Sequence, residues 1–328
     1  MTKLDTRAEV NALENSRGAG ADRAFKRISF GSGMAVLVIL GLIAVITTVQ
    51  AWPAIQQAGL SLVTERRWAP SNPDGAIFGG LAFIYGTVVT SVLALAIAVP
   101  VSFGIGLFLT ELAPRWIRTP AITVLDLLAA IPSVVFGLVG ILVLAPALKP
   151  LYESVHSLFQ GVPVLGSVFG EVNSGRGFAT AAIVLAVMVI PIITSISREV
   201  FDTVPVSDKQ AAYALGATRW EMIRGAVMPH SFAGLVGAAM LGLGRAMGET
   251  IAVSLVIGSA THISANVFSS GNTMASIIVQ QWGESSGVHT SALIAIGVLL
   301  FAITIVINYG ARIVVRRAEV RMKGATAL

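Results

Sequence analysis

Residues 207–229 read S-D-K-Q-A-A-Y-A-L-G-A-T-R-W-E-M-I-R-G-A-V-M-P, a polar stretch able to form helices between two hydrophobic segments. Ser207 with Gln210 fits the capping-box pattern that begins a helix, and Thr218 with Glu221 fits it again. Two helix starts predict a short hairpin of helices. In a chain that is otherwise mostly hydrophobic, an organised hairpin on one side of a membrane indicates a surface that binds a partner.

The turn and the end of this hairpin have their own signals. Gly216 lies where the first helix has to stop, because glycine adopts positive φ at little steric cost. Pro229 is predicted to end the second helix, since its ring cannot continue the hydrogen-bond ladder. The apolar faces are Ala211, Ala212 and Leu215 on the first helix and Met222, Ile223, Ala226 and Val227 on the second. An amphipathic pair on lipid headgroups is the alternative, but both helices are short and have few aromatic anchors beyond Trp220.

The composition is that of a membrane protein. Hydrophobic residues make up 55% of the 328 residues and charged residues 12%, with a mean hydropathy of +0.82. Segments able to cross about 30 Å of hydrocarbon recur, and we predict an all-α membrane protein with six transmembrane helices. The predicted spans are 30–51, 81–109, 122–147, 178–197, 232–260 and 291–315. Pro132 lies inside the third of these, where neighbouring helices have to cover the freed carbonyl.

Positive charges set the predicted orientation. Most of the 22 lysines and arginines fall on one side of the membrane if the chain crosses it six times. The exceptions are Arg66, Arg67, Lys149 and Arg176 on the other side and Arg245 inside a span. Because positive residues concentrate in cytoplasmic loops, both termini and the hairpin are predicted to be cytoplasmic, in a multi-pass protein of the plasma (inner) membrane.

The predicted organisation is a single membrane domain. Residues 1–29 form a cytoplasmic tail, 30–51 a first helix, 81–315 the main transmembrane domain, and 316–328 a second cytoplasmic tail. The first span is interpreted as a retained helix, because 29 mostly polar residues precede it and no clear small-residue cleavage site follows. The net charge of +5 is attributed to orientation and contact with anionic lipid, since no basic patch has interleaved aromatics for nucleic acid.

Several chemistries are disfavoured by what the sequence lacks. It has no cysteine, and its four histidines are scattered without metal-ligand spacing, so we expect no metal site. No lysine follows a glycine, whereas a P-loop requires that pair to reach the phosphates of ATP. We therefore expect no enzyme activity and no cofactor on this chain, with ATP and magnesium bound by a partner.

Two ionisable residues lie inside the predicted fifth span. Arg245 and Glu249 are four residues apart, within pairing reach on one helical face, and each costs about 3 kcal/mol at mid-bilayer. Small residues continue that face backwards, which suits close helix approach or a narrow polar pathway. A guanidinium can hold a tetrahedral oxyanion through two parallel hydrogen bonds. A structural salt bridge and a substrate pathway both remain open, and Thr250 either lines that pathway or bonds back to a carbonyl.

The hairpin resembles the EAA loop of permease subunits in bacterial ABC importers. Its Q-A-A-x-x-x-G at 210–216 and A-V-M-P at 226–229 correspond to the E-A-A-x-x-x-G and I-x-L-P of that family, with departures at Gln210, Ala226 and Met228. The resemblance implies a coupling helix pair that seats in a groove of a separate ATPase. The residues implied to make that contact are Gln210, Ala211, Ala212, Gly216, Thr218, Glu221 and Pro229.

Three further segments resemble phosphate-specific importer permeases of the PstC type. They are A-V-P-V-S-F-G-I-G-L-F-L-T-E-L-A-P at 98–114, A-I-P-S-V-V-F-G-L at 130–138 and G-R-A-M-G-E-T-I-A-V at 244–253. The resemblance implies a type I importer (MetI-like) fold, with Arg245 and Glu249 in phosphate passage. It also implies a second, PstA-type permease, two copies of a PstB-type ATPase and an external PstS-type phosphate-binding protein.

Two alternatives stay open at this point. Within the importer class, a sulfate or molybdate permease is the nearest alternative, and competition assays with those anions would separate it from a phosphate permease. A secondary transporter would also fit six spans with buried charges, but the sequence shows no paired repeat of broken helices and the hairpin would be unexplained.

Overall fold

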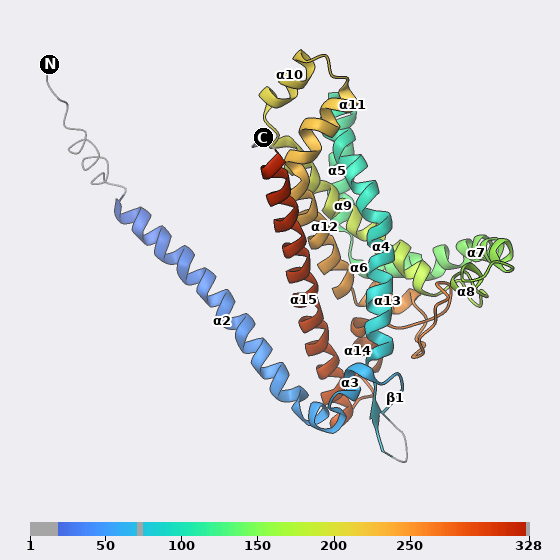
Figure 1. Ribbon diagram of the computed structural model, residues 1–328. Coiled ribbons are helices and arrows are strands. Elements are labelled where there is room, and N and C mark those ends of the chain that lie inside the picture. Colours follow the sequence, from blue (N-terminus) through green and yellow to red (C-terminus); the bar gives the residue numbers. More distant parts are fainter. Residues whose placement is uncertain (1–18, 71–74, 326–328) are drawn as a thin grey trace, which may run out of the picture. The chain divides into compact units, whose positions relative to one another are not determined.

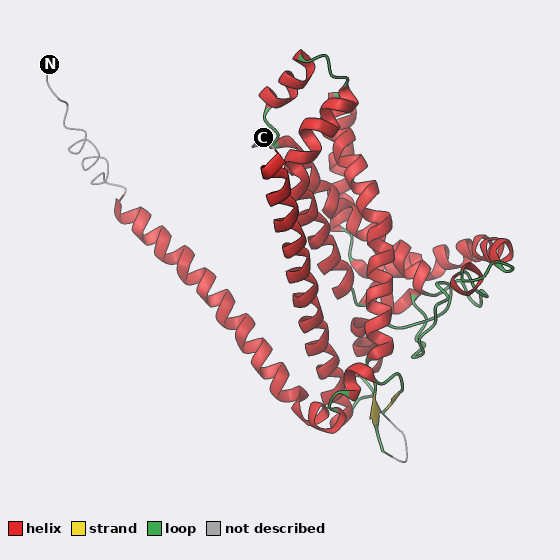
Figure 2. Cartoon of the chain, in the orientation of Figure 1, coloured by secondary structure: helices red, strands yellow, loops and turns green. Residues whose placement is uncertain are grey.

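The computed structural model describes residues 19–70 and 75–325, and it is almost entirely helical (Figures 1 and 2). Its helices as far as the fourth span are α2 (Ala19–Ala58), α3 (Ser61–Thr64), α4 (Leu81–Leu107), η1 (Phe108–Leu112), α5 (Arg115–Ala130), α6 (Ser133–Val139), η2 (Gly140–Leu144), α7 (Ala145–Phe159), α8 (Leu165–Val168) and α9 (Phe178–Asp202). Those that follow are α10 (Val206–Ala214), α11 (Arg219–Met222), η3 (Ile223–Val227), α12 (Met228–Gly248), α13 (Ile251–Val256), α14 (Met274–Trp282) and α15 (Val288–Ala325). The elements written η are π-helical turns.

Six described helical segments are long and apolar enough to cross a membrane, which confirms the predicted all-α class with six spans. They are Gly20–Ala58, Leu81–Leu112, Ser133–Phe159, Phe178–Asp202, Arg219–Gly248 and Val288–Ile313. Each holds a predominantly apolar stretch of about the length that a bilayer core requires. Residues 1–18 of the predicted N-terminal tail and residues 326–328 of the C-terminal tail lie outside the described residues.

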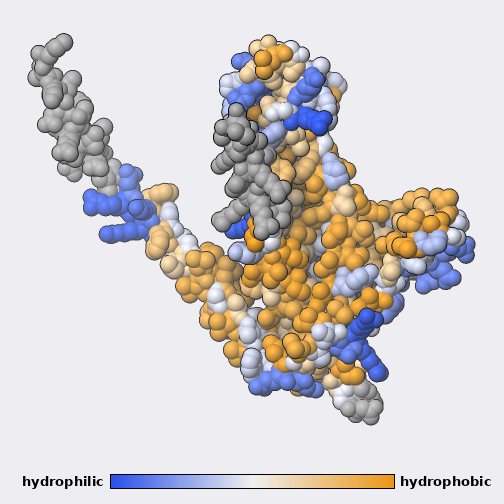
Figure 3. All heavy atoms as spheres, in the orientation of Figure 1, coloured by the Kyte–Doolittle hydropathy of each residue, from blue (hydrophilic) through white to orange (hydrophobic). Residues whose placement is uncertain are grey.

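The chain divides into two compact units, Met1–Gln50 and Ala51–Leu328. In the first unit, α2 begins at Ala19, earlier than the predicted start of the first span, and its apolar side chains are mostly exposed. In the second unit, orange hydrophobic side chains cover the surface over α4 and α15, and blue hydrophilic ones gather at the 207–229 hairpin (Figure 3). This distribution is expected of a bundle whose outer surface faces lipid.

The predicted third span, 122–147, is wrong in its boundaries. Pro132 disfavours a helical conformation at Ile131, which is extended with ψ 130°, and the helix ends at Ala130. A new helix starts at Ser133, and the third span is therefore Ser133–Phe159. The part before Pro132 becomes α5, which has no buried residue, so Asp126 lies on a separate surface helix and not in a span.

A central helix organises the second unit. α9 packs against α4 and α12, and its side chains Val189 and Ile193 are fully buried in the main hydrophobic cluster. α12 approaches it through glycines: a Cβ at Gly242 would lie 2.5 Å from Ile193 Cδ1, and one at Gly234 would lie 2.6 Å from Val200 Cγ1. The small-residue face of the fifth span is thus the surface along which α12 meets α9.

The end of this unit opposite the hairpin holds a short antiparallel sheet (Figure 1). Strands β1 (Trp68–Ala69) and β2 (Ile77–Phe78) pair there, with Trp68 opposite Phe78. The Trp68 side chain is buried beside Phe83 and donates a hydrogen bond to Gln281 Oε1 on α14 at 2.8 Å. This cluster ties the loop between the first two spans to α14 and α15.

Candidate functional site

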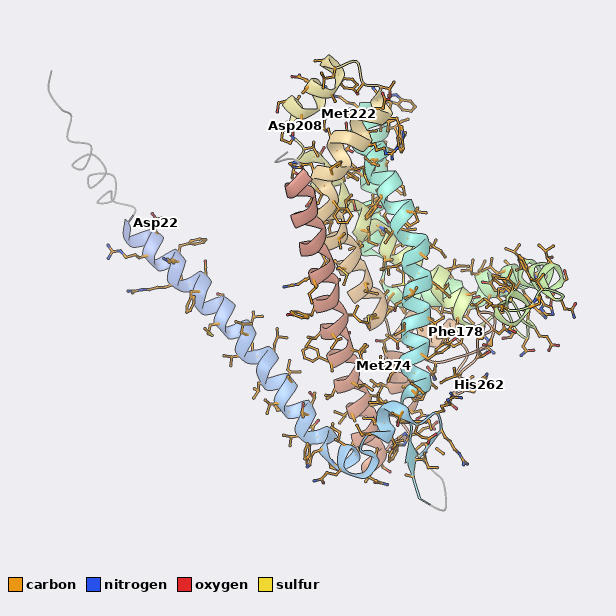
Figure 4. All side chains as sticks on the ribbon, in the orientation of Figure 1. Asp22, Phe178, Asp208, Met222, His262 and Met274 are labelled. Carbon is orange, nitrogen blue, oxygen red and sulfur yellow. The ribbon has the colours of Figure 1, made fainter. Side chains whose placement is uncertain are left out.

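The hairpin predicted at 207–229 is present. It consists of α10, a turn at Gly216, and α11 with η3; Figure 4 labels Asp208 on its first helix and Met222 on its second. Gly216 has a φ of +82°, and the backbone N–H of Ala217 donates to Ala212 O at 3.1 Å. The positive φ that the sequence predicted at Gly216 is therefore confirmed.

One of the two predicted helix caps is confirmed and the other is wrong. Thr218 and Glu221 form a complete capping box, in which the Thr218 N–H donates to Glu221 Oε2 at 2.8 Å. Ser207 caps nothing; its hydroxyl donates to Asp208 Oδ1. The reason is Pro205, whose φ of −56° and extended ψ already start the helix at Val206, so Ser207 lies inside the first turn.

The cap at Thr218 yields a first testable prediction. Thr218→Ala removes the hydroxyl that accepts from the Glu221 N–H, and losing such a cap costs about 1 kcal/mol. We expect the first amides of α11 to exchange hydrogen about fivefold faster, measured by mass spectrometry on the purified protein. Ser207→Ala is the matched control, because Ser207 does not cap, and equal acceleration in both variants would contradict the assignment.

The prediction that Pro229 ends the second helix is wrong. α11, η3 and α12 form one continuous helical segment from Arg219 to Gly248, and Pro229 lies in the first turn of α12. The five residues of η3, which directly precede α12, are in π-helical conformation. A π turn is wider than an α turn, so it accommodates the proline ring that would clash with the carbonyl four residues earlier. The second half of the hairpin is thereby continuous with the fifth span.

The two faces of the hairpin differ in burial. Met222, Ile223 and Val227 are buried in a cluster with Phe201 and Leu235. The opposite face is open: Leu215 is 89% exposed and Trp220 is 67% exposed. Among the predicted coupling residues Ala212 is half-buried, and those exposed are Gln210, Ala211, Gly216, Thr218, Glu221 and Pro229. Apolar side chains exposed together at the tip of a hairpin are typical of a surface that another protein covers.

The charged pair of the fifth span lies where the helix ends. The predicted fifth span, 232–260, is wrong in its boundaries: the helical segment runs from Arg219 to Gly248, about twelve residues earlier, and Glu249 is its C-terminal cap residue. Arg245 Nη2 and Glu249 Oε2 are 3.5 Å apart, with the arginine side chain 50% exposed and the glutamate 5% exposed. The buried Glu249 also accepts from the Ala252 N–H at 3.4 Å, at the start of α13. The Thr250 hydroxyl donates to Gly248 O at 3.0 Å, back toward the chain.

Arg245 faces a groove between α9, α12 and α15. This groove has a volume of about 950 Å³ and is lined by apolar side chains and glycines except at Arg245, Asn308 and Arg312. Asn308 and Arg312 are four residues apart on α15, so they share one face of that helix. The arrangement places two guanidinium groups and one amide on a groove that is otherwise apolar, and guanidinium groups can donate hydrogen bonds to an oxyanion.

Sequence reasoning missed two features of these sites. Asn308 and Arg312 carry no motif, and only the packing of α15 beside α12 brings them to Arg245. The ion pair between Lys209 and Glu111 joins residues 98 positions apart, for which no local pattern exists. Among the described residues no group of three or more histidines, aspartates or glutamates is placed to hold a metal ion.

Comparison with known proteins defines the class. Residues 102–320 match the family described as "Binding-protein-dependent transport system inner membrane component", which agrees with a multi-pass membrane protein. A solved bacterial alginate ABC transporter, in complex with an alginate pentasaccharide-bound periplasmic protein, has a chain similar in fold with a TM-score of 0.58. That match covers 90% of this chain and 97% of the other at 16% identity, and it shows the fold alone.

The particular subgroup follows from closer relatives. The chain is 42% identical to the "Phosphate transport system permease protein PstC" of Mesorhizobium japonicum, over 93% of each chain. It is 40% identical to the protein of that name from Pasteurella multocida, over 97% of this chain and 98% of the other. The chain therefore belongs to the inner membrane components of binding-protein-dependent transport systems and, within them, to the PstC permeases.

Proposed function

We propose that this chain is a permease subunit of an ATP-driven importer of inorganic phosphate. The observation that carries the proposal is identity of about 40% to PstC phosphate permeases over nearly the whole chain. The exposed apolar tip of the hairpin supports it, because a permease without its own nucleotide site needs a surface that an ATPase can grip. ATP and magnesium then belong to that partner, and the chain itself is not an enzyme.

The proposed assembly is heteromeric. A PstA-type permease, two copies of a PstB-type ATPase and a PstS-type phosphate-binding protein complete it, as the names of the relatives imply. The excess of lysine and arginine in the segments on the hairpin side supports a cytoplasmic location for the hairpin and both termini. The loops at the opposite end then face the binding protein.

The mechanism we propose is alternating access. ATP binding closes the ATPase pair and displaces the 207–229 hairpins, and because each hairpin continues into α12 the two permeases rock from inward- to outward-facing. The binding protein then releases phosphate into the cavity. Gln210, Ala211, Gly216, Thr218, Glu221 and Pro229 face the ATPase, and Ala212 holds the hairpin to its own cluster.

Arg245 and Glu249 have different roles in this proposal. The half-exposed guanidinium of Arg245 donates hydrogen bonds to phosphate as the anion passes through the groove. The buried Glu249 restrains Arg245 so that the anion is not trapped, and Thr250 fixes the break between α12 and α13. A protonated phosphate can also donate a hydrogen bond to Glu249, which fully ionised sulfate cannot do near neutral pH.

Reconstitution tests the proposal. The chain is placed in proteoliposomes with its partner permease, ATPase and binding protein, and uptake of labelled phosphate is followed. We expect uptake that requires ATP, persists without a proton gradient, and is not reduced by excess sulfate or molybdate. Uptake that follows a proton gradient without ATP would establish a secondary transporter instead, and uptake of sulfate or molybdate in preference to phosphate would refute the substrate assignment.

A further inference from the structure

The first helix of the hairpin has little contact with the bundle. α10 has no buried residue, and it packs against α11 and η3, which belong to its own hairpin. Only Ala212 packs against the apolar cluster around Phe201 and Met222. The second half of the hairpin, by contrast, is buried in that cluster and continues into α12. A separate attachment is therefore needed if α10 is to move together with the spanning helices.

A single ion pair supplies that attachment. Lys209 Nζ donates to Glu111 Oε1 at 2.5 Å, from α10 to η1, the π turn that ends the second span after α4. The Glu111 side chain is 9% exposed and the Lys209 side chain is 20% exposed. Among the residues that the structure describes, no other ion pair joins the 207–229 hairpin to a spanning segment.

The pair is partly buried, with Glu111 the more enclosed partner, so water and salt screen it less than a fully exposed pair. Removing Lys209 leaves the Glu111 charge uncompensated, which is the costly case for an enclosed ion pair. Exposed pairs contribute little by comparison, because water and salt screen them. The Arg118–Asp202 pair nearby is of that second kind, with side chains 37% and 49% exposed.

The link leads directly into the core of the bundle. Glu111 lies in η1, which continues α4 without a break. Phe103 and Leu107 of α4 pack against the hairpin's apolar cluster. α4 lies along the central helix α9, where Ser102 donates to Ile190 O at 3.2 Å. A displacement of α10 is therefore passed through Glu111 to the second span, while a displacement of α11 passes through η3 to the fifth.

We propose that Lys209 and Glu111 are positioning residues for energy coupling, which transmit movement of the first coupling helix to the second membrane span. This inference rests on the proposed function, in which an ATPase moves the hairpin. The pair does not touch substrate or nucleotide. It determines how far the displacement of α10 by the ATPase is transmitted to α4. Without the pair, movement of α10 reaches α4 only indirectly, through the apolar cluster that Phe103 and Leu107 share with the second half of the hairpin.

A charge exchange tests this assignment in the complete reconstituted complex. Lys209→Glu places two acids together, and we expect phosphate transported per ATP hydrolysed to fall about tenfold while the ATPase rate persists. Glu111→Lys has the same expected effect. The double variant Lys209→Glu/Glu111→Lys restores an ion pair in the same place, and we expect it to recover to within about threefold of wild type. Arg118→Glu, which breaks the exposed pair, is the matched control with unchanged coupling.

Each outcome decides the question. Loss in both single variants with recovery in the exchange supports the link, because a general folding defect would not be rescued by a second charge reversal. Wild-type coupling in the single variants, or an exchange as uncoupled as they are, overturns it. The wild-type complex is measured first: if it shows no ATP-dependent phosphate uptake, the proposed function fails, and that failure is distinct from loss confined to the Lys209 and Glu111 variants.

Discussion

Replacing Gly216 with valine is expected to uncouple ATP hydrolysis from phosphate transport. Gly216 has a φ of +82°, which a β-branched residue adopts only with strain of about 1–3 kcal/mol. A Cβ at this position would meet nothing within 4 Å, so the effect comes from the backbone and not from a clash. The turn between α10 and α11 then relaxes, and the two helices no longer present one surface to the ATPase.

The measurement compares phosphate uptake with ATP hydrolysis in proteoliposomes. We expect the Gly216→Val complex to transport about tenfold less phosphate per ATP. Gly225→Val is the matched control, because Gly225 lies in η3 without positive φ and a Cβ there also meets nothing within 4 Å. Wild-type coupling in Gly216→Val would count against the hairpin as the coupling element.

The second large effect is expected at Arg245. Arg245→Ala removes the guanidinium that faces the groove, and a charge-assisted hydrogen bond of this kind contributes about 1.5–3 kcal/mol. We expect phosphate uptake to fall about 10- to 100-fold while the complex assembles at normal abundance and hydrolyses ATP. Arg66→Ala removes an exposed arginine from the opposite end of the chain's second unit and is expected to change nothing.

A double variant separates the two interpretations of this pair. If Arg245 and Glu249 only neutralise each other, Arg245→Ala harms the protein by leaving Glu249 buried and unpaired, and Glu249→Gln should restore uptake. If Arg245 contacts phosphate, Arg245→Ala/Glu249→Gln stays defective. Glutamine keeps an oxygen to accept from the Ala252 N–H, so the start of α13 is preserved in both cases. Full uptake in Arg245→Ala alone would dispose of the pathway role.

Local signals in the sequence were sufficient for the turn of the hairpin. A glycine at 216 and a capping box at Thr218 each act within a few residues, and both lie in the structure as predicted. The number of spans was also predictable, because hydrophobic length is a property of each segment alone. The predicted cap at Ser207 is wrong, although Ser207 and Gln210 match the capping-box pattern. Pro205, two residues earlier, sets the start of the helix at Val206.

The remaining features depend on packing between distant segments. Pro229 continues a helix because a π turn precedes it, and that turn is held by Ile223 and Val227 in a cluster with Phe201. The third span is an exception, because its break has a local signal: Pro132 separates α5 from α6, whereas the prediction follows the hydrophobic length of the whole stretch. The meeting of Lys209 with Glu111 has no sequence signal, since it joins segments whose approach is set by the whole bundle.

The most direct test of the account is a cross-link from the tip of the hairpin. The sequence has no cysteine, so Leu215→Cys, at a side chain 89% exposed, carries the only thiol on the chain. A thiol-to-amine cross-linker applied to the intact complex is predicted to join it to the ATPase subunit, whereas Val164→Cys, 74% exposed in the loop after the third span, should not react with that subunit. An ATPase bound in the complex but cross-linked only from elsewhere, with Leu215→Cys unreacted, would contradict the account.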